Sequence, residues 1–162
     1  MSTDPKHIRN VVLLGHSHCG KTSMIEAMLY ESKAITRRGT VEAGNTVSDF
    51  SDIEQERRGS LFSKLMHVNW KESKINIVDT PGSDDFVGEI LSSMKVSDLG
   101  IMVLNAAHGV EVGTELIWEY KEKFQLPGMF VINQCDHEKA DFDSTLEQAI
   151  SRFGPKLIPF QY

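Results

Sequence analysis

The sequence predicts a three-layer α/β domain built on a mostly parallel β-sheet with one antiparallel edge strand. Apolar runs alternate with helix-forming stretches, and runs such as 101–104 are almost continuously apolar, as expected when helices cover both faces of a sheet. The predicted strands are 8–14, 61–70, 74–79, 99–105 and 128–133, and the predicted helices are 20–31, 84–97, 112–124 and 144–153.

The second and third predicted strands form the exception to parallel pairing. Only Lys71, Glu72 and Ser73 separate them, which is too short for a crossover helix and fits a hairpin. We therefore expect this pair to be antiparallel and to lie at one edge of the sheet.

The loop between the first predicted strand and the first predicted helix carries the strongest motif. Residues 15–22 read G-H-S-H-C-G-K-T, which matches the phosphate-binding pattern G-x-x-x-x-G-K-[ST], the P-loop. Lys21 would reach the terminal phosphates, and the Thr22 hydroxyl would bind Mg²⁺. A glycine-rich turn without a ligand is the alternative, but strand, loop and helix all agree with the motif. The N–H groups that would surround the phosphates are those of the intervening residues His16, Ser17, His18, Cys19 and Gly20.

Two weaker motifs follow in the order that a guanine-nucleotide site requires. Residues 79–82 read D-T-P-G, in which Asp79 can hold Mg²⁺ through water and the Gly82 N–H can face a γ-phosphate. Residues 133–136 read N-Q-C-D after an apolar strand, and the Asp136 carboxylate can accept two hydrogen bonds from a guanine edge. Asn and Asp are also ordinary turn residues, so the preceding P-loop carries the interpretation. The expected ligands are GTP or GDP with Mg²⁺ held by Thr22 and Asp79, and Asn133, Gln134 and Asp136 would contact the nucleoside.

A long polar segment, residues 32–60, lies between the first predicted helix and the hairpin. Loops of this length are usually functional or disordered, and beside a P-loop the functional interpretation is a segment that the γ-phosphate and Mg²⁺ order. A flexible solvated insertion is the alternative. We expect the segment to be mobile when no γ-phosphate is bound, because its few apolar residues offset little ordering entropy.

These motifs resemble the GTPase domain of elongation factor G, which has a Ras-like P-loop NTPase fold, and they resemble its divergent paralogues more than the housekeeping factor. The resemblance covers nearly the whole chain and includes, besides the three motifs, Ser48-Asp49, residues 54–59, Asp85-Phe86 with Glu89, and Gly109-Val110 with Thr114, Glu115 and Trp118. It implies GTP binding, GTPase activity in translation, and the ribosome as partner. It also implies further domains beyond this chain, so that residues 1–162 are a partial guanine-nucleotide-binding domain.

Three positions depart from the family pattern. Ser83 stands where the family has a histidine that positions the attacking water, and Gln134 replaces a lysine that packs along the nucleotide. Leu61 aligns with a Mg²⁺-binding threonine, and Ser60 can substitute only if the register shifts by one residue. Weak or lost hydrolysis is therefore expected, and no catalytic residue is assigned.

Three functions remain open after these departures. The chain is a slow GTPase of translation, a ribosome-binding module with little or no use of nucleotide, or a P-loop ATPase of another branch. The Asn133 and Asp136 pair argues against the ATPase. Because the chain ends before the family's base-contacting loop, we expect micromolar or weaker affinity for GDP.

Composition limits the partners. Seventeen basic and 23 acidic residues give a net charge of −6, which argues against a broad nucleic-acid surface, and no DNA partner is expected. No apolar run approaches the roughly 18 residues that span a bilayer, and the first residues lack the apolar stretch of a signal peptide. We expect a monomeric, cytoplasmic domain without membrane contact.

Overall fold

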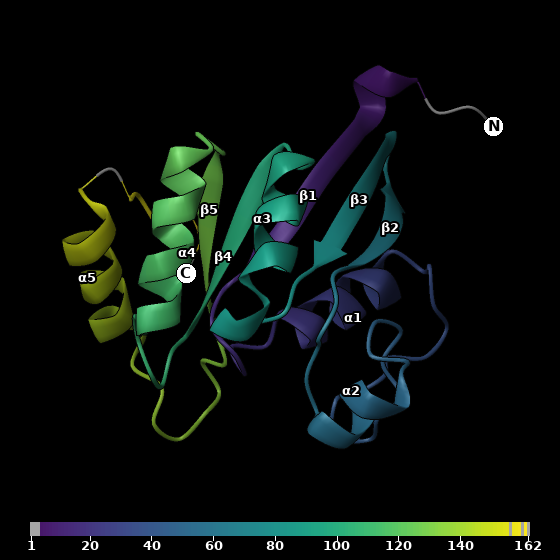
Figure 1. The fold of residues 1–162 in the computed structure, drawn as a ribbon, viewed down its shortest axis with the longest axis horizontal. Helices are drawn as coiled ribbons and strands as arrows, with labels where there is room; N and C mark the ends of the chain where they lie inside the picture. Colours follow the sequence, from purple (N-terminus) through teal and green to yellow (C-terminus); the bar gives the residue numbers. More distant parts are fainter. Residues whose placement is uncertain (1–3, 156, 160, 162) are drawn as a thin grey trace.

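The β-sheet has the strand order β2–β3–β1–β4–β5 in the computed structural model, which describes residues 4–155, 157–159 and 161 (Figure 1). Strand β1 pairs in parallel with β3 and β4, and β4 pairs in parallel with β5, whereas β2 pairs antiparallel with β3 at the edge. The predicted sheet, with its hairpin, is confirmed. The strands are β1 (Ile8–Leu14), β2 (Lys64–Trp70), β3 (Ser73–Asp79), β4 (Leu99–Asn105) and β5 (Gly128–Asn133).

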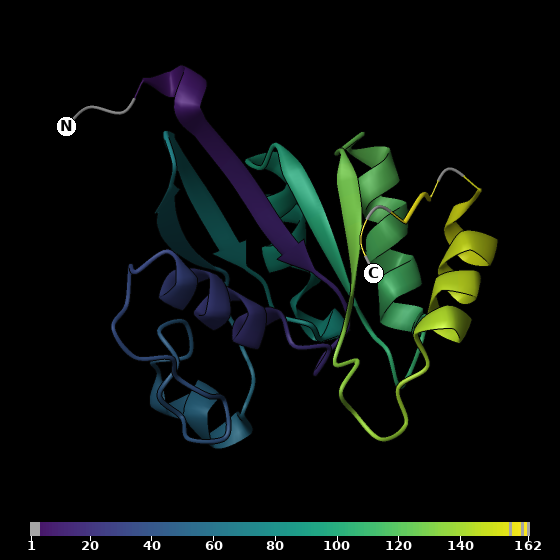
Figure 2. The same cartoon turned by 180° about the vertical axis from the view of Figure 1, so that it is seen from behind.

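Helices cover both faces of this sheet, as the apolar strands require. Helix α1 lies on one face, and α3 and α4 lie on the other, with α5 beside α4 (Figures 1 and 2). Each predicted helix is present, with ends displaced by up to three residues, and the first three residues of the predicted helix 84–97 form a separate 3-10 helix. The helices are η1 (Pro5–His7), α1 (Lys21–Glu31), α2 (Asp52–Arg57), η2 (Asp84–Phe86), α3 (Val87–Lys95), α4 (Val112–Lys123) and α5 (Phe142–Phe153), where η denotes a 3-10 helix.

The prediction of a loop throughout residues 32–60 is wrong at α2. Ser51 caps this helix, because its hydroxyl accepts the Glu54 N–H at 3.4 Å and donates to the Glu54 carboxylate at 2.7 Å. The Glu54 N–H, which would otherwise lack a partner at the helix start, is thus bound by the N-cap side chain. Helix α2 was not predicted because it is short and polar, without the apolar stripe by which a helix is recognised in a sequence.

Strand β2 begins at Lys64, three residues later than the sequence predicted. The backbone N–H groups of Leu61 and Phe62 donate to the Glu54 carboxylate at 2.8 and 3.4 Å, and that of Ser63 donates to Glu89. The donors of these residues are therefore directed to carboxylates and not to the sheet.

The core has two halves, one on each face of the sheet. Val11 and Leu13 of β1 pack with Ile25 and Leu29 of α1. The alternate β1 residues, Val12 and Leu14, pack on the opposite face with residues of α3 and α4, which follows from the two-residue period of a strand. Burial on both sides fixes the end of β1 and so the start of the P-loop.

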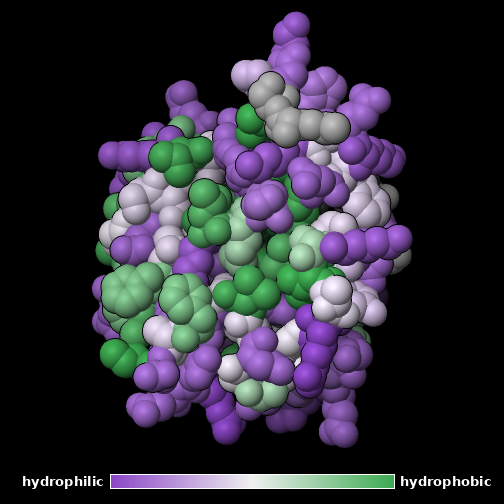
Figure 3. Space-filling view, turned by 90° about the vertical axis from the view of Figure 1, so that its right-hand side faces the viewer, coloured by the Kyte–Doolittle hydropathy of each residue, from purple (hydrophilic) through white to green (hydrophobic). Residues whose placement is uncertain are grey.

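One region of the α1 face is less covered. A pocket of about 430 Å³, lined mainly by apolar side chains of α1, β2 and β3, lies between the helix and the sheet edge. In the view from this side, apolar side chains gather in the middle of a largely hydrophilic surface (Figure 3). Within the described part of the chain, no helix has the length and apolar character needed to cross a membrane.

Candidate functional site

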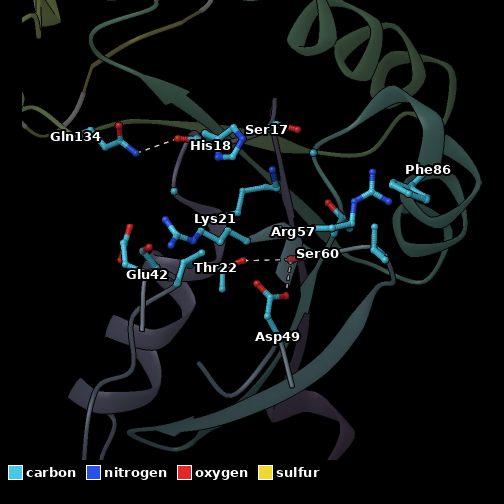
Figure 4. Close-up of a pocket in the computed structure, with 18 residues that line it drawn as sticks. Ser17, His18, Lys21, Thr22, Glu42, Asp49, Arg57, Ser60, Phe86 and Gln134 are labelled. Atoms are coloured by element: carbon cyan, nitrogen blue, oxygen red, sulfur yellow. Dashed lines mark hydrogen bonds between the residues drawn. The ribbon is translucent and has the colours of Figure 1, made fainter. Parts of the chain in front are cut away.

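A polar pocket of about 430 Å³ opens where β1 and β3 end. The carboxyl ends of parallel strands are where open α/β sheets bind ligands. The pocket is lined by P-loop and α1 residues (Ser17, His18, Gly20, Lys21, Thr22, Ser23), by residues of the segment 32–60 and its end (Val41, Glu42, Asp49, Arg57, Arg58, Gly59, Ser60, Leu61), and by Thr80, Gly82, Phe86 and Gln134 (Figure 4).

The P-loop has the conformation of a phosphate cradle. Lys21 is almost fully buried, and its ammonium group donates to the carbonyl oxygens of Gly15 at 2.8 Å and His16 at 2.9 Å. Gly20 has φ of 92°, and a Cβ there would lie 2.4 Å from the Asn133 side-chain nitrogen. Only glycine satisfies both conditions. The loop is thus closed against the motif that follows β5.

Asn133 and Gln134 attach the end of β5 to the P-loop. The Asn133 amide donates to the Cys19 carbonyl at 3.0 Å, and the Gln134 amide donates to the His18 carbonyl at 3.0 Å. Asn105 of β4 donates to the Gln134 side-chain oxygen at 2.7 Å, so both ends of this amide are held. Asp136 is exposed and lies outside the pocket lining.

Thr22 and Asp79 meet at the opposite end of the P-loop. The Thr22 hydroxyl donates to one Asp79 carboxylate oxygen at 2.8 Å. Burial raises the pKa of the Asp79 carboxyl, although the Thr22 hydrogen bond and the Lys21 charge act in the opposite direction. The other oxygen, Oδ1, is buried and has no hydrogen-bond partner among the described residues.

Ser60, and not Leu61, is the switch residue that reaches Thr22. The two hydroxyl oxygens lie 3.4 Å apart, and Ser60 donates to Asp49 at 2.8 Å. This contact agrees with the alternative that the sequence left open, in which Ser60 takes the place of Leu61 through a register shift of one residue. Arg58, which ends α2 with φ of 52°, turns the chain so that Ser60 points inward.

Asp49 and Glu54 are two further residues of this site that no sequence motif assigned to a role. Asp49 is 3% exposed, its Oδ2 has no partner among the described residues, and its charge helps to raise the pKa of Asp79. Glu54 is fully buried and pairs with Lys64. Burial alone would raise the pKa of Glu54, but hydrogen bonds from Lys64, Leu61 N–H and Ser51 together lower it to about 2. The S-x-x-E spacing of Ser51 and Glu54, which is typical of the start of a helix, was the sequence signal that could have indicated a role for Glu54.

These oxygens fit a magnesium ion. Unpaired carboxylate oxygens of Asp49 and Asp79 flank the hydroxyl groups of Thr22 and Ser60. Mg²⁺ prefers such hard oxygen ligands, together with water and phosphate oxygens. A cation bound at Asp79 Oδ1 would favour the charged form of this carboxyl, whose pKa burial raises.

The D-T-P-G loop packs directly on the P-loop. Thr80 donates to the Leu13 carbonyl at 2.6 Å, and a Cβ on Gly82 would lie 2.6 Å from both the Lys21 ammonium and the Ser17 nitrogen. The Ser83 hydroxyl instead serves η2, where it donates to the Asp85 carboxylate at 3.2 Å and accepts the Asp85 N–H at 3.4 Å. Gly82 therefore reaches the pocket, and Ser83 caps the 3-10 helix.

The fold and this pocket define a P-loop nucleotide-binding domain. A family model described as the elongation factor Tu GTP binding domain matches residues 6–159. The chain therefore belongs to that family, as the GTP-binding domain of an elongation factor G-like translation factor, and the resemblance read from the motifs is confirmed.

Individual relatives agree with this assignment. Ribosome-releasing factor 2, mitochondrial, of Anopheles gambiae is 38% identical over 96% of this chain, and elongation factor G 2 of Borreliella afzelii (strain PKo) is 36% identical over 94%. A crystal structure of a Thermus thermophilus protein superposes with a TM-score of 0.88 at 36% identity over 92% of this chain. The chain spans 21%, 22% and 22% of the lengths of these three proteins.

Proposed function

We propose that this domain binds GTP and GDP with Mg²⁺ and acts as a slow GTPase in a ribosome-associated translation factor. The observation that carries the proposal is the junction of Lys21, Thr22 and Asp79 at the start of α1. Lys21 and the P-loop N–H groups bind the phosphates, and the helix N-terminus adds a favourable dipole. Bound Mg²⁺ would neutralise phosphate charge, held by Thr22 and Ser60 with Asp49 and Asp79 around it.

The base would lie at the other end of the pocket. Asn133 and Gln134 fix the loop that follows β5 against the P-loop. The Asp136 carboxylate would accept the two N–H groups of the guanine edge, while adenine offers an acceptor there and is repelled. In this proposal Gln134 takes the place of the family lysine by holding the His18 carbonyl.

Slow hydrolysis follows from the residue at position 83, where a serine hydroxyl stands in place of the family's water-positioning imidazole. A hydroxyl that is occupied by Asp85 positions water poorly, and general acid–base groups are worth about 10²- to 10⁴-fold in rate. A ribosome-binding module without GTPase activity is the second candidate, and the same Ser83 favours it. The ribosome as partner, the monomeric state and the cytoplasmic location rest on the family or the sequence alone, and stay predictions.

Nucleotide titration tests the binding part. The domain is titrated with labelled GTP, GDP and ATP in Mg²⁺, and we expect a guanine preference with Kd values in the micromolar range or weaker, about −8 kcal/mol or less favourable. Asp136→Ala should weaken GTP and GDP binding and leave ATP binding unchanged. Nanomolar affinity or a preference for ATP would contradict the proposal.

Phosphate release tests the catalytic part. The full-length protein that carries this domain is mixed with ribosomes and GTP, and its turnover is compared with that of an ordinary elongation factor G. Far slower turnover is expected, and no turnover at all favours the second candidate. Turnover within a few-fold of the ordinary factor would refute slow hydrolysis.

A further inference from the structure

We propose that Arg57 and Arg58, at the end of α2, recognise the third phosphate and so distinguish GTP from GDP. The inference rests on the proposed nucleotide binding and deepens it. It assigns the discrimination between the two nucleotides to two side chains outside the P-loop, D-x-x-G and N-x-x-D motifs.

The pocket has a base end and a phosphate end, and these arginines lie at the phosphate end. Gln134 marks the end for the base, because it binds the His18 carbonyl of the P-loop. Ser60 marks the opposite end, where its hydroxyl approaches Thr22. Figure 4 shows Gln134 on one side of the pocket and Arg57 beside Ser60 on the other. A nucleotide laid along the P-loop from the base end reaches α2 only with its last phosphate.

The two guanidinium groups are free to bind an anion. Both arginines line the pocket, and both are exposed. Neither guanidinium group makes a hydrogen bond or ion pair with another described residue, whereas those of Arg38 and Arg152 both do. A guanidinium group presents paired N–H donors that match phosphate oxygens, and hydrogen bonds between charged groups are the strong ones.

The charge balance of the pocket also calls for an anion on this side. Arg57 and Arg58 join Lys21 around one cavity, and like charges in one cavity repel when no anion lies between them. The acidic residues of the lining do not neutralise them. Asp49 already pairs with the Lys64 ammonium group through Oδ1, which also accepts the Ser60 hydroxyl, and Glu42 is exposed and without an ion pair in the described chain.

Helix α2 holds the arginines in place relative to the P-loop. Buried Glu54 ties the helix to Leu61 and Lys64, which follow it in the chain. Between these anchors, Ser60 contacts Thr22. The side chains of Arg57 and Arg58 are therefore delivered to the pocket by a fixed turn, and binding the third phosphate would in return hold the segment closed.

The test is the ratio of two affinities. Kd values are measured for the slowly hydrolysed analogue GTPγS and for GDP, both with Mg²⁺, in the wild type, Arg57→Ala, Arg58→Ala and the double variant. We expect weaker GTPγS binding, by about 10- to 100-fold in the double variant, with GDP affinity unchanged. GDP binding itself shows that each variant is folded. Arg57→Lys should retain part of the effect, because lysine keeps the charge and loses the paired donors.

Arg37→Ala is the matched control. Arg37 is an exposed arginine of the same segment that lies outside the pocket lining, and its loss should change neither affinity. If the double variant shifts GTPγS and GDP equally, or leaves their ratio within about twofold, this inference is wrong while the proposed function stands. If the wild type binds neither nucleotide, the proposed function fails and this inference falls with it.

Discussion

The hydroxyl groups of Thr22 and Ser60 lie 3.4 Å apart, which joins the start of α1 to the end of the segment 32–60. Each hydroxyl is also bound to a buried carboxylate, Thr22 to Asp79 at 2.8 Å and Ser60 to Asp49 at 2.8 Å. Four polar side chains from distant parts of the chain thus form one continuous row. A single Mg²⁺ ion could bind to this row and couple the P-loop to the switch segment.

Ser60→Ala tests this coupling. We expect the variant to lose about tenfold in GTPγS affinity at saturating Mg²⁺, because one hydroxyl ligand is gone, while GDP affinity changes little. Leu61→Ala is the control, since the Leu61 side chain supplies no oxygen. Titrations at several Mg²⁺ concentrations measure both. A loss with Leu61→Ala but not with Ser60→Ala would show that the register in solution differs from the one described.

Ser83→His tests the missing imidazole. Because Ser60 already supplies the switch hydroxyl, this one substitution should raise ribosome-stimulated phosphate release by itself, within the roughly 10²- to 10⁴-fold that an acid–base group contributes. Leu61→Thr should add nothing. The rates of the wild type, both single variants and the double variant are compared. If phosphate release rises only when Ser83→His and Leu61→Thr are combined, position 61 and not Ser60 is the one that needs a hydroxyl for Mg²⁺.

Gly82→Ala tests the contact between the D-T-P-G loop and the P-loop. The new Cβ would lie 2.6 Å from the Ser17 nitrogen, so backbone must move. We expect a loss of about 1–3 kcal/mol in the free energy of unfolding and weaker GDP binding. Gly88→Ala in α3 is the matched control, because a Cβ there meets nothing within 4 Å. It should stabilise the domain by about 0.5–1 kcal/mol. Urea unfolding measures the free energy of unfolding of both variants. Equal changes in the two would contradict the close contact described for Gly82.

Glu54→Gln tests the anchor of α2 through its pH dependence. The pKa of Glu54 is lowered from 4.5 to about 2, so its charged form stabilises the folded state. This contribution is complete above the unfolded pKa and is lost as the pH falls from 4.5 toward 2. The wild type should therefore exceed the variant in unfolding free energy most at neutral pH, and the gap should narrow below pH 4.5. A gap that stays constant with pH would mean that packing, and not charge, anchors the helix.

The sequence by itself determined the sheet, most of the helices and the phosphate-binding loop. Strand β1, helix α1 and the P-loop between them depend on local signals: an apolar run, a helical pattern and glycines at fixed spacing. The hairpin of β2 and β3 followed from a connection too short for a helix. Such features are encoded within about 10–20 neighbouring residues, and a period or a motif reveals them.

Only the tertiary structure decided how the segment 32–60 meets the P-loop. Ser60 pairs with Thr22, which is 38 positions away, and Glu54 binds N–H groups beyond the end of its own helix. The family pattern aligns Leu61 with the switch threonine and leaves Ser60 as the alternative, and in the fold it is the Ser60 hydroxyl that approaches Thr22. Whether Ser60 or Leu61 lies at Thr22 depends on buried polar groups, because each of them needs a hydrogen-bond partner elsewhere in the fold. Local patterns carry no information about partners so distant. The position of the segment 32–60 depends instead on the burial of Asp49 and Glu54, which both pair with Lys64.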